Sequence, residues 1–169
     1  RIYQVWQRMA EDFAAYDINI TTDPFYDDQN NRGPTIAQVL ISHNGDFNND
    51  NAGGRAYLGV FGFSNYATYY SPALVYYNKL SSRADYIAEA ASHELGHNLG
   101  LSHDGTSSKS YYNGHGSGAT SWGPIMGTGY NRNVSQWSNG EYYDANNSQD
   151  DESRLNSKLG LRADDHADS

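Results

Sequence analysis

The order of periodic segments along the chain predicts an α+β fold. Apolar residues recur at helical spacing near the start, in the middle and near the end of the chain, at residues 2–16, 83–100 and 149–159. Short apolar segments typical of strands lie between the first two helices, whereas residues 105–121 are rich in glycine and serine and are expected to be irregular. We therefore predict a sheet with packed helices, then an irregular part and a final helix.

Size and charge limit the kind of protein that this chain can be. It has 169 residues, enough for one domain with a substantial core but too few for two. Its net charge of -9 argues against binding to nucleic acid, whose phosphates it would repel, and is compatible with protein substrates and bound calcium. No apolar stretch of about 18 residues is present, so no contact with a membrane interior is expected.

The first part of the chain predicts one helix and one short strand. Residues 2–16 have apolar side chains three and four positions apart, as in an amphipathic helix. Residues 18–22 alternate between apolar and polar side chains and predict a strand, which Asp23 and Pro24 end. A polar loop is expected over residues 27–34.

Three further strands are predicted before the second helix. Residues 35–42 are rich in apolar side chains and predict a strand that is buried. Residues 55–61 and 73–77 are predicted to be strands from their aromatic and β-branched content, with a loop over residues 45–54 before them.

The second and third helices have recognisable packing faces and ends. Ser148 is a candidate N-cap for a last helix over residues 149–159, with Asp150 and Asp151 in its first turn and Gly160 just past its end. The residues of the helix at 83–100 that are available to pack inward are Ile87, Ala90, Ala91, Leu95 and Leu99.

The most informative stretch of the sequence is residues 93–104, HELGHNLGLSHD. His93 and His97 are one helical turn apart, so both imidazoles can reach one metal ion. Gly100 allows the backbone to leave the helix with a positive φ and to bring His103 back as a third ligand. Three histidines leave one tetrahedral position open, which is typical of a catalytic Zn²⁺ site rather than a structural one.

The residue between the first two ligands supplies the chemistry. Glu94 is beside His93 on the helix, where its carboxylate can face a metal-bound water and accept a proton as that water attacks a carbonyl. The short HExxH core also occurs by chance in solvated helices. The glycine, the third histidine and Asp104 at fixed offsets make that alternative much weaker.

With these residues the chain resembles the metzincin superfamily of zinc peptidases. The resemblance implies a tight turn that carries a methionine below the metal, and residues 123–127, GPIMG, fit this Met-turn through Met126. Asp104 directly after the third histidine is similar to the adamalysin/reprolysin branch. Thr128 stands where astacins and serralysins have a tyrosine, and Tyr130 is the nearest one. Animal adamalysins carry disulfides and this chain has no cysteine, so it is most similar to a bacterial reprolysin-like member.

The resemblance also implies an architecture. It implies a metzincin-like catalytic domain with a twisted mixed sheet and an active-site helix in an upper part, residues 1–104. Below it lies a smaller irregular part, residues 105–163, with the Met-turn and the final helix. Residues 164–169 are expected to begin a linker. A strand is implied before the first helix, and either it lies upstream of this sequence or the sheet is built differently. Asp104 is expected to anchor the turn after the third ligand through hydrogen bonds.

The function implied is that of a zinc-dependent endopeptidase that hydrolyses internal peptide bonds. Substrate is expected to lie extended and to pair with a strand edge, for which residues 56–59 are the candidate, an ordinary sheet strand being the alternative. A catalytically silent, zinc-containing protein-binding module is the alternative function, but such a module has no need of Glu94. A zinc hydrolase of non-peptide substrates would share the same ligands. We expect a secreted, bacterial, monomeric enzyme, stable without disulfides and part of a longer multidomain precursor, since Arg1 cannot be an initiator.

A second metal is weakly indicated. Residues 46–50 carry oxygen donors at alternate positions, as calcium loops do, but Asn51 and Tyr57 stand where an EF-hand has glycine and glutamate. This segment is therefore interpreted either as a looser Ca²⁺ site or as a solvated polar loop. The histidines expected to be surface, loop or tail residues rather than ligands are His43, His115 and His166.

Overall fold

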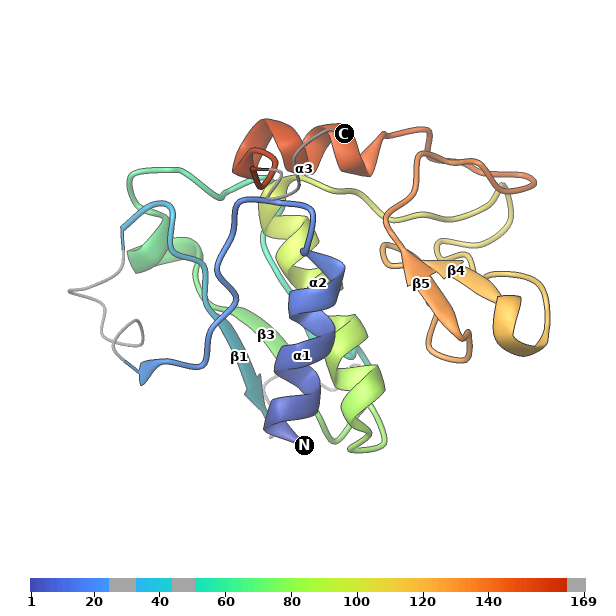
Figure 1. Ribbon diagram of the computed structural model, residues 1–169, viewed down its shortest axis with the longest axis horizontal. Helices are drawn as coiled ribbons and strands as arrows, with labels where there is room; N and C mark the ends of the chain where they lie inside the picture. The colour runs from blue at the N-terminus through green and yellow to red at the C-terminus, as the bar shows by residue number, and fades with distance from the viewer. Residues whose placement is uncertain (25–32, 44–50, 164–169) are drawn as a thin grey trace, which may run out of the picture.

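A computed structural model describes residues 1–24, 33–43 and 51–163 and has an α+β fold (Figure 1). The predicted class, with a mixed sheet and a central helix that carries His93 and His97, is confirmed. The elements in chain order are α1 (Ile2–Asp12), β1 (Val39–Ser42), β2 (Gly54–Arg55), the π-helical turn η3 (Tyr66–Tyr70), β3 (Ala73–Tyr76), α2 (Ala84–Leu99), the 3-10 turn η4 (Gly118–Thr120), β4 (Trp122–Pro124), β5 (Val134–Gln136) and α3 (Asp151–Leu159).

Two small sheets lie on different sides of the molecule. The larger has the order β1-β3-β2, with β1 parallel and β2 antiparallel to β3. The smaller pairs β4 with β5 in parallel. Figure 1 shows β1 and β3 on the left and β4 and β5 on the right, with α1 and α2 between them and α3 across the end of α2.

The core forms where α2 packs against α1 and β3. The residues of α2 predicted to face inward are all buried. They meet Val5 and Met9 from α1, Phe13 just after α1, and Val75 from β3. At the end of α1, Asp12 joins the helix to the rest of the fold: Ser92 Oγ donates to its carboxylate at 2.6 Å and Trp137 Nε1 donates to its carbonyl at 2.7 Å. The middle of α2 is therefore held on several sides, and the histidines are on this part of it.

The end of α2 follows the sequence prediction. Gly100 has a φ of 101°, in the left-handed region that favours glycine. Its N–H donates to the His97 carbonyl and the Leu101 N–H donates to the Gly96 carbonyl, so the last carbonyls of the helix are satisfied. The chain then turns back past the helix toward His103.

One predicted strand is shorter and more exposed than expected, and another is absent. Only Val39–Ser42 of the segment 35–42 pairs in the sheet, and Leu40 and Ile41 are 45% and 40% exposed. The prediction of a buried strand was therefore wrong, because β1 is an edge strand of a three-stranded sheet. Residues 18–22 form no strand. Residues 18–22 and β1 both line an apolar groove of about 940 Å³. The Ile20 carbonyl accepts a hydrogen bond from Trp6 Nε1 instead of from a strand.

The predicted strand over residues 55–61 is reduced to Gly54–Arg55. The N–H groups of Gly59 and Phe61 donate to the His97 and Asn98 carbonyls at the end of α2. This backbone therefore completes the helix end instead of a strand ladder, and residues 56–59 are not the edge strand that was predicted. The antiparallel edge of the sheet is β2.

The ends of α1 and α3 also differ from the prediction. The first helix ends at Asp12 instead of residue 16, because Ala14 and Tyr16 donate to carbonyls three residues back and so form turns. The last helix begins at Asp151, and its N-cap is Asp150, whose carboxylate accepts from Ser153 N–H. Ser148 is therefore not the cap.

Some predictions lie outside the described residues: the candidate calcium loop at 46–50, most of the polar loop at 27–34, and the tail with His166. Among the helices that are described, none is long and apolar enough to cross a membrane.

We predict that Asn98 is a structural support of the site. It is fully buried, its Oδ1 accepts from Tyr66 Oη at 2.7 Å, and its Nδ2 donates to the Tyr57 carbonyl at 2.8 Å. Asn98→Ala removes two hydrogen bonds made from a fully buried position, so the free energy of unfolding should fall by about 2–3 kcal/mol. Urea unfolding measures it, with exposed Asn156→Ala on α3 as the control. Equal stability of the two variants would contradict this role.

Candidate metal centre

The structure brings the three predicted ligands together. His93 and His97 project from adjacent turns of α2 with ring centroids 4.7 Å apart, and His103 returns beside them after the turn at Gly100. One ring nitrogen from each lies within 4.8 Å of the others. The Nε2 atoms of His97 and His103 are 2.9 Å apart. Two imidazole nitrogens that face each other so closely suit a shared cation.

Backbone carbonyls orient two of the imidazoles. His93 Nδ1 is 2.8 Å from the Ile125 carbonyl oxygen, and His97 Nδ1 is 2.7 Å from the Leu101 carbonyl oxygen. A carbonyl can only accept, so each Nδ1 carries the proton and donates it. The Nε2 lone pairs are then directed toward the centre of the cluster, which is how metal-binding histidines are usually held.

The electrostatics of the cluster keep the histidines neutral. Burial, and then the nearby His97, lower the pKa of His93 to about 3 and that of His103 to about 4. Burial also lowers the pKa of His97. A histidine must be deprotonated at the ligating nitrogen to bind a metal. Three converging neutral imidazoles therefore fit Zn²⁺ with an open fourth position.

A tight turn lies directly below the cluster. Gly127 N–H donates to the Pro124 carbonyl, and Met126 at its centre is fully buried. A Cβ at Gly96 of α2 would lie 2.8 Å from Met126 Sδ, so only glycine lets the helix approach this closely. The turn supplies the Ile125 carbonyl that orients His93. It therefore supports the ligand from below, although the chain is irregular here.

Asp104 ties the turn of the third ligand to the rest of the site. Its N–H donates to the Met126 carbonyl, its own carbonyl accepts from Tyr112, and its fully buried carboxylate accepts from Asn147 at 3.2 Å. These contacts agree with the anchoring role expected for it. The second carboxylate oxygen, Oδ2, has no hydrogen-bond partner among the described residues.

A second buried carboxyl lies close enough to interact with Asp104. Asp151, at the start of α3, is fully buried, and one of its oxygens accepts from Ser138 N–H at 3.1 Å. The other oxygen finds no hydrogen-bond partner in the part of the chain that the structure describes. Burial, and then the negative charge of Asp104, raise the pKa of Asp151 to about 8. We therefore infer that Asp151 is largely protonated at neutral pH.

Glu94 is buried beside the cluster and faces the edge strand β2. A Cβ at Gly54 would lie 2.6 Å from Glu94 Oε1, so glycine leaves the room that the carboxylate occupies. Burial raises the pKa of Glu94 to about 8, and the charge of Arg55 opposes this rise. A dication at the histidines would also favour the ionised form.

Two tyrosines near the site were missed by the sequence analysis as site residues. The ring centroid of Tyr111 lies 4.3 Å from that of His103. Burial raises the pKa of both Tyr111 and Tyr130, and the negative charge of Glu94 raises both further. Both belong to irregular segments, so no periodicity singled them out. Only the closeness of Tyr130 to the Met-turn was a signal in the sequence.

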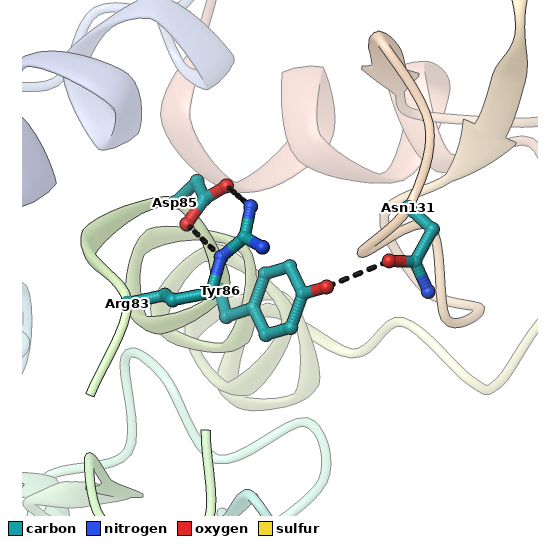
Figure 2. A network of polar contacts seen from close by, with 4 residues as sticks. All are labelled: Arg83, Asp85, Tyr86 and Asn131. Atoms are coloured by element: carbon teal, nitrogen blue, oxygen red, sulfur yellow. Dashed lines mark hydrogen bonds and ion pairs between the residues drawn. The ribbon is translucent and has the colours of Figure 1, made fainter. Parts of the chain in front are cut away.

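The first turn of α2 also holds the segment that follows the Met-turn. Tyr86 Oη donates to Asn131 Oδ1 at 2.7 Å. Figure 2 shows this contact and, beside it, the ion pair between Arg83 and Asp85. The Arg83 guanidinium also lies 4.2 Å from the centre of the Tyr86 ring. Because the ion pair between Arg83 and Asp85 is largely exposed, it contributes little to stability. The packing of the Tyr86 ring on the Tyr130 ring contributes more.

Two further histidines lie apart from the cluster. His43 packs against Tyr77, and His115 contacts Tyr112 Oη at 3.0 Å and the ring of Trp122. Within the described part of the chain, the three-histidine cluster is the group that could hold a metal ion.

Three neutral imidazoles on a helix and its following turn, with a glutamate next to the first, define a zinc peptidase. Comparison with protein families agrees: the Reprolysin_5 model, described as metallo-peptidase family M12, matches residues 15–138. The chain belongs to this family and is a zinc metallopeptidase with a three-histidine zinc site. The resemblance to reprolysin-type enzymes drawn from the motif is thereby confirmed. Searches of curated proteins and of solved structures gave no match.

We predict that zinc affinity depends on His103 and not on His115. His103→Ala removes one of three ligating nitrogens and should weaken binding by more than about 100-fold, since loss of even an outer contact costs about 10–100-fold. His115→Ala, a histidine of the same irregular region, should bind zinc like the wild type. Competition with a chromophoric chelator measures both affinities. Similar losses in the two variants would contradict the assignment.

We predict that Asp151 makes the protein less stable as pH rises. Its folded pKa of about 8 lies above the ordinary value of 3.8, so the folded state binds the proton more tightly. The resulting stability is complete below the unfolded pKa and is lost as pH rises toward 8. Asp151→Asn carries no titrating group at this position. Its free energy of unfolding should therefore rise relative to that of the wild type between pH 5 and 8.

Urea unfolding at several pH values measures this difference. Asp150→Asn is the control. Hydrogen bonds from Ser153 lower the pKa of Asp150, so the stability that this carboxylate contributes is lost as pH falls and not as it rises. A difference between Asp151→Asn and wild type that stays constant with pH would show that the carboxyl does not titrate as described.

Proposed function

We propose that this metallopeptidase cleaves internal bonds of polypeptides, with His93, His97 and His103 as the zinc ligands and Glu94 as the general base. The observation that carries the proposal is the convergence of three neutral imidazoles beside a buried carboxylate. Zinc bound there supplies a Lewis acid and lowers the pKa of a bound water to about 7. The protein's own residues then have to bind the substrate and move one proton.

In the proposed reaction Glu94 moves that proton. Its carboxylate accepts the proton of the water that attacks the scissile carbonyl carbon, and then gives it to the amine nitrogen as the C–N bond breaks. Gly54 and the burial of Glu94 keep the carboxylate close to the cluster and shielded from bulk water. The Ile125 and Leu101 carbonyls keep two ligands from rotating during the step. No covalent intermediate with the protein is required.

We place the substrate along β2 instead of residues 56–59. This two-residue strand is the antiparallel edge of the sheet, and Gly54 within it contacts Glu94. An extended peptide that pairs with this edge would lie beside the general base. The Met-turn and the segment tied to α2 through Tyr86 would form the opposite wall.

The finer description of the family is part of the same proposal. We assign a metzincin-like division into residues 1–104 and 105–163, supported by the separation of the two sheets (Figure 1) and the turn at Met126. We further propose a secreted, bacterial, monomeric enzyme, because residues 93–104 are similar to reprolysin-like enzymes while the chain has no cysteine, unlike the animal members.

We predict that Glu94→Gln abolishes peptide cleavage but retains zinc. The amide cannot accept the proton, so kcat should fall by about 10²–10⁴-fold, whereas the imidazoles are unchanged. Cleavage of casein and metal content by elemental analysis measure the two properties. Glu89→Gln, on the same helix, should keep its activity. If Glu94→Gln cleaves casein at the wild-type rate, the general-base mechanism is wrong.

The same assays separate the alternatives. A silent protein-binding module would bind zinc and show no turnover in the wild type. A zinc hydrolase of other substrates would leave peptides intact and turn over esters or acetylated amines in a parallel panel.

A further inference from the structure

Tyr111 stands at the side of the zinc cluster. Its ring centroid is 4.3 Å from that of His103 and 6.1 Å from that of His93, with the rings tilted by 41° and 35°. The residue is 38% exposed, so a substrate can reach it. It is also close enough to Glu94 to interact electrostatically. Tyr111 therefore borders two ligands and the general base.

The backbone next to Tyr111 is fixed by the site itself. The Tyr112 N–H donates to the Asp104 carbonyl at 2.7 Å, and the Tyr112 carbonyl accepts from Thr128 N–H at 2.9 Å. One bond comes from the turn of the third ligand and the other from the end of the Met-turn. The Tyr112 ring also stacks on Tyr142, with centroids 4.2 Å apart. The position of Tyr111 is therefore set by the same elements that set the ligands.

The hydroxyl of Tyr111 adds a hydrogen-bond donor that His93, His97 and an ionised Glu94 do not offer. His93 and His97 already donate their Nδ1 protons to carbonyls, and an ionised Glu94 can only accept. When water attacks a peptide bond, negative charge develops on the carbonyl oxygen, and a fixed hydrogen-bond donor there lowers the barrier. A tyrosine O–H is neutral, is held by its ring and is such a donor.

We propose that Tyr111 is a further catalytic residue of this peptidase, whose hydroxyl donates a hydrogen bond to the carbonyl oxygen of the scissile bond. This inference rests on the proposed function. The water oxygen bonds to the carbonyl carbon, Glu94 carries the proton to the amine nitrogen, and the C–N bond breaks. Tyr111 keeps its own proton throughout. The ring has a separate, positioning role, since it packs on the third ligand.

Tyr111→Phe separates the two roles, because it keeps the ring and removes the hydroxyl. In the zinc-loaded chain, kcat for a quenched fluorescent peptide should fall by about 100-fold, the effect of losing one such donor. KM should stay within about threefold, because the contact strengthens only as charge develops. Zinc affinity, measured by chelator competition, should equal that of the wild type. Tyr69→Phe, an exposed tyrosine of η3, is the control for loss of a hydroxyl elsewhere.

A binding measurement tests the same contact without turnover. A phosphinic peptide resembles the tetrahedral, negatively charged state, so its affinity should fall in Tyr111→Phe roughly as kcat does. The affinity of the uncleaved substrate peptide, measured in a Glu94→Gln background, should not change. This pair of results would not arise from a role in packing alone.

The outcomes decide between the roles. A wild type that cleaves the peptide and a Tyr111→Phe variant that cleaves equally well would overturn the role of Tyr111 while leaving the proposed function intact. Loss of activity that follows loss of zinc would assign Tyr111 to ligand positioning only. If Tyr130→Phe shows the expected pattern and Tyr111→Phe does not, the donor is Tyr130. A wild type without peptidase activity would instead overturn the proposed function, and the phosphinic peptide would still report on Tyr111.

Discussion

The site depends on two backbone carbonyls that accept hydrogen bonds from ligand imidazoles. The Ile125 carbonyl comes from the turn at Met126, and the Leu101 carbonyl comes from the first residue after the αL position at Gly100. Each fixes the tautomer and the rotation of its imidazole, so that Nε2 is free to bind a metal. The helix provides the spacing of the first two ligands, but the irregular segments on either side make that spacing useful.

The burial that builds the site also has a cost in stability. Glu94, Asp104 and Asp151 are all buried carboxyls with raised pKa values, and each is easier to bury when protonated. Asp104 holds the turn that carries His103 through its hydrogen bonds. Asp151 caps no helix, and one of its oxygens has no hydrogen-bond partner among the described residues. A fold selected for stability alone would replace such groups. Their presence around a ligand turn is typical of a site where function opposes stability.

The sequence predicted those parts of the molecule that local rules determine. The ligand spacing, Glu94, the end of α2 at Gly100, β3 and the inward face of α2 all follow from helical period, strand composition and the conformational freedom of glycine. The predictions of strands at 18–22 and 55–61 were wrong because these backbones form other hydrogen bonds. The first accepts from a side chain of α1, and the second donates to the end of α2, far along the chain. Tyr111 could not be found either, since its relation to His103 depends on a turn with no periodic pattern.

Metal binding and folding must be linked in this architecture. The ligands His93 and His97 belong to a packed helix, but His103 and the carbonyl of Ile125 belong to segments with little regular structure, which hydrogen bonds of Asp104 join to each other. A cation that binds all three imidazoles therefore connects the core around α2 to the region that contains β4 and β5. Since a ligand that binds only the folded state stabilises it, zinc held by these residues would stabilise this connection. The same segments position Tyr111, so a bound zinc would also help to order the residue proposed to assist it.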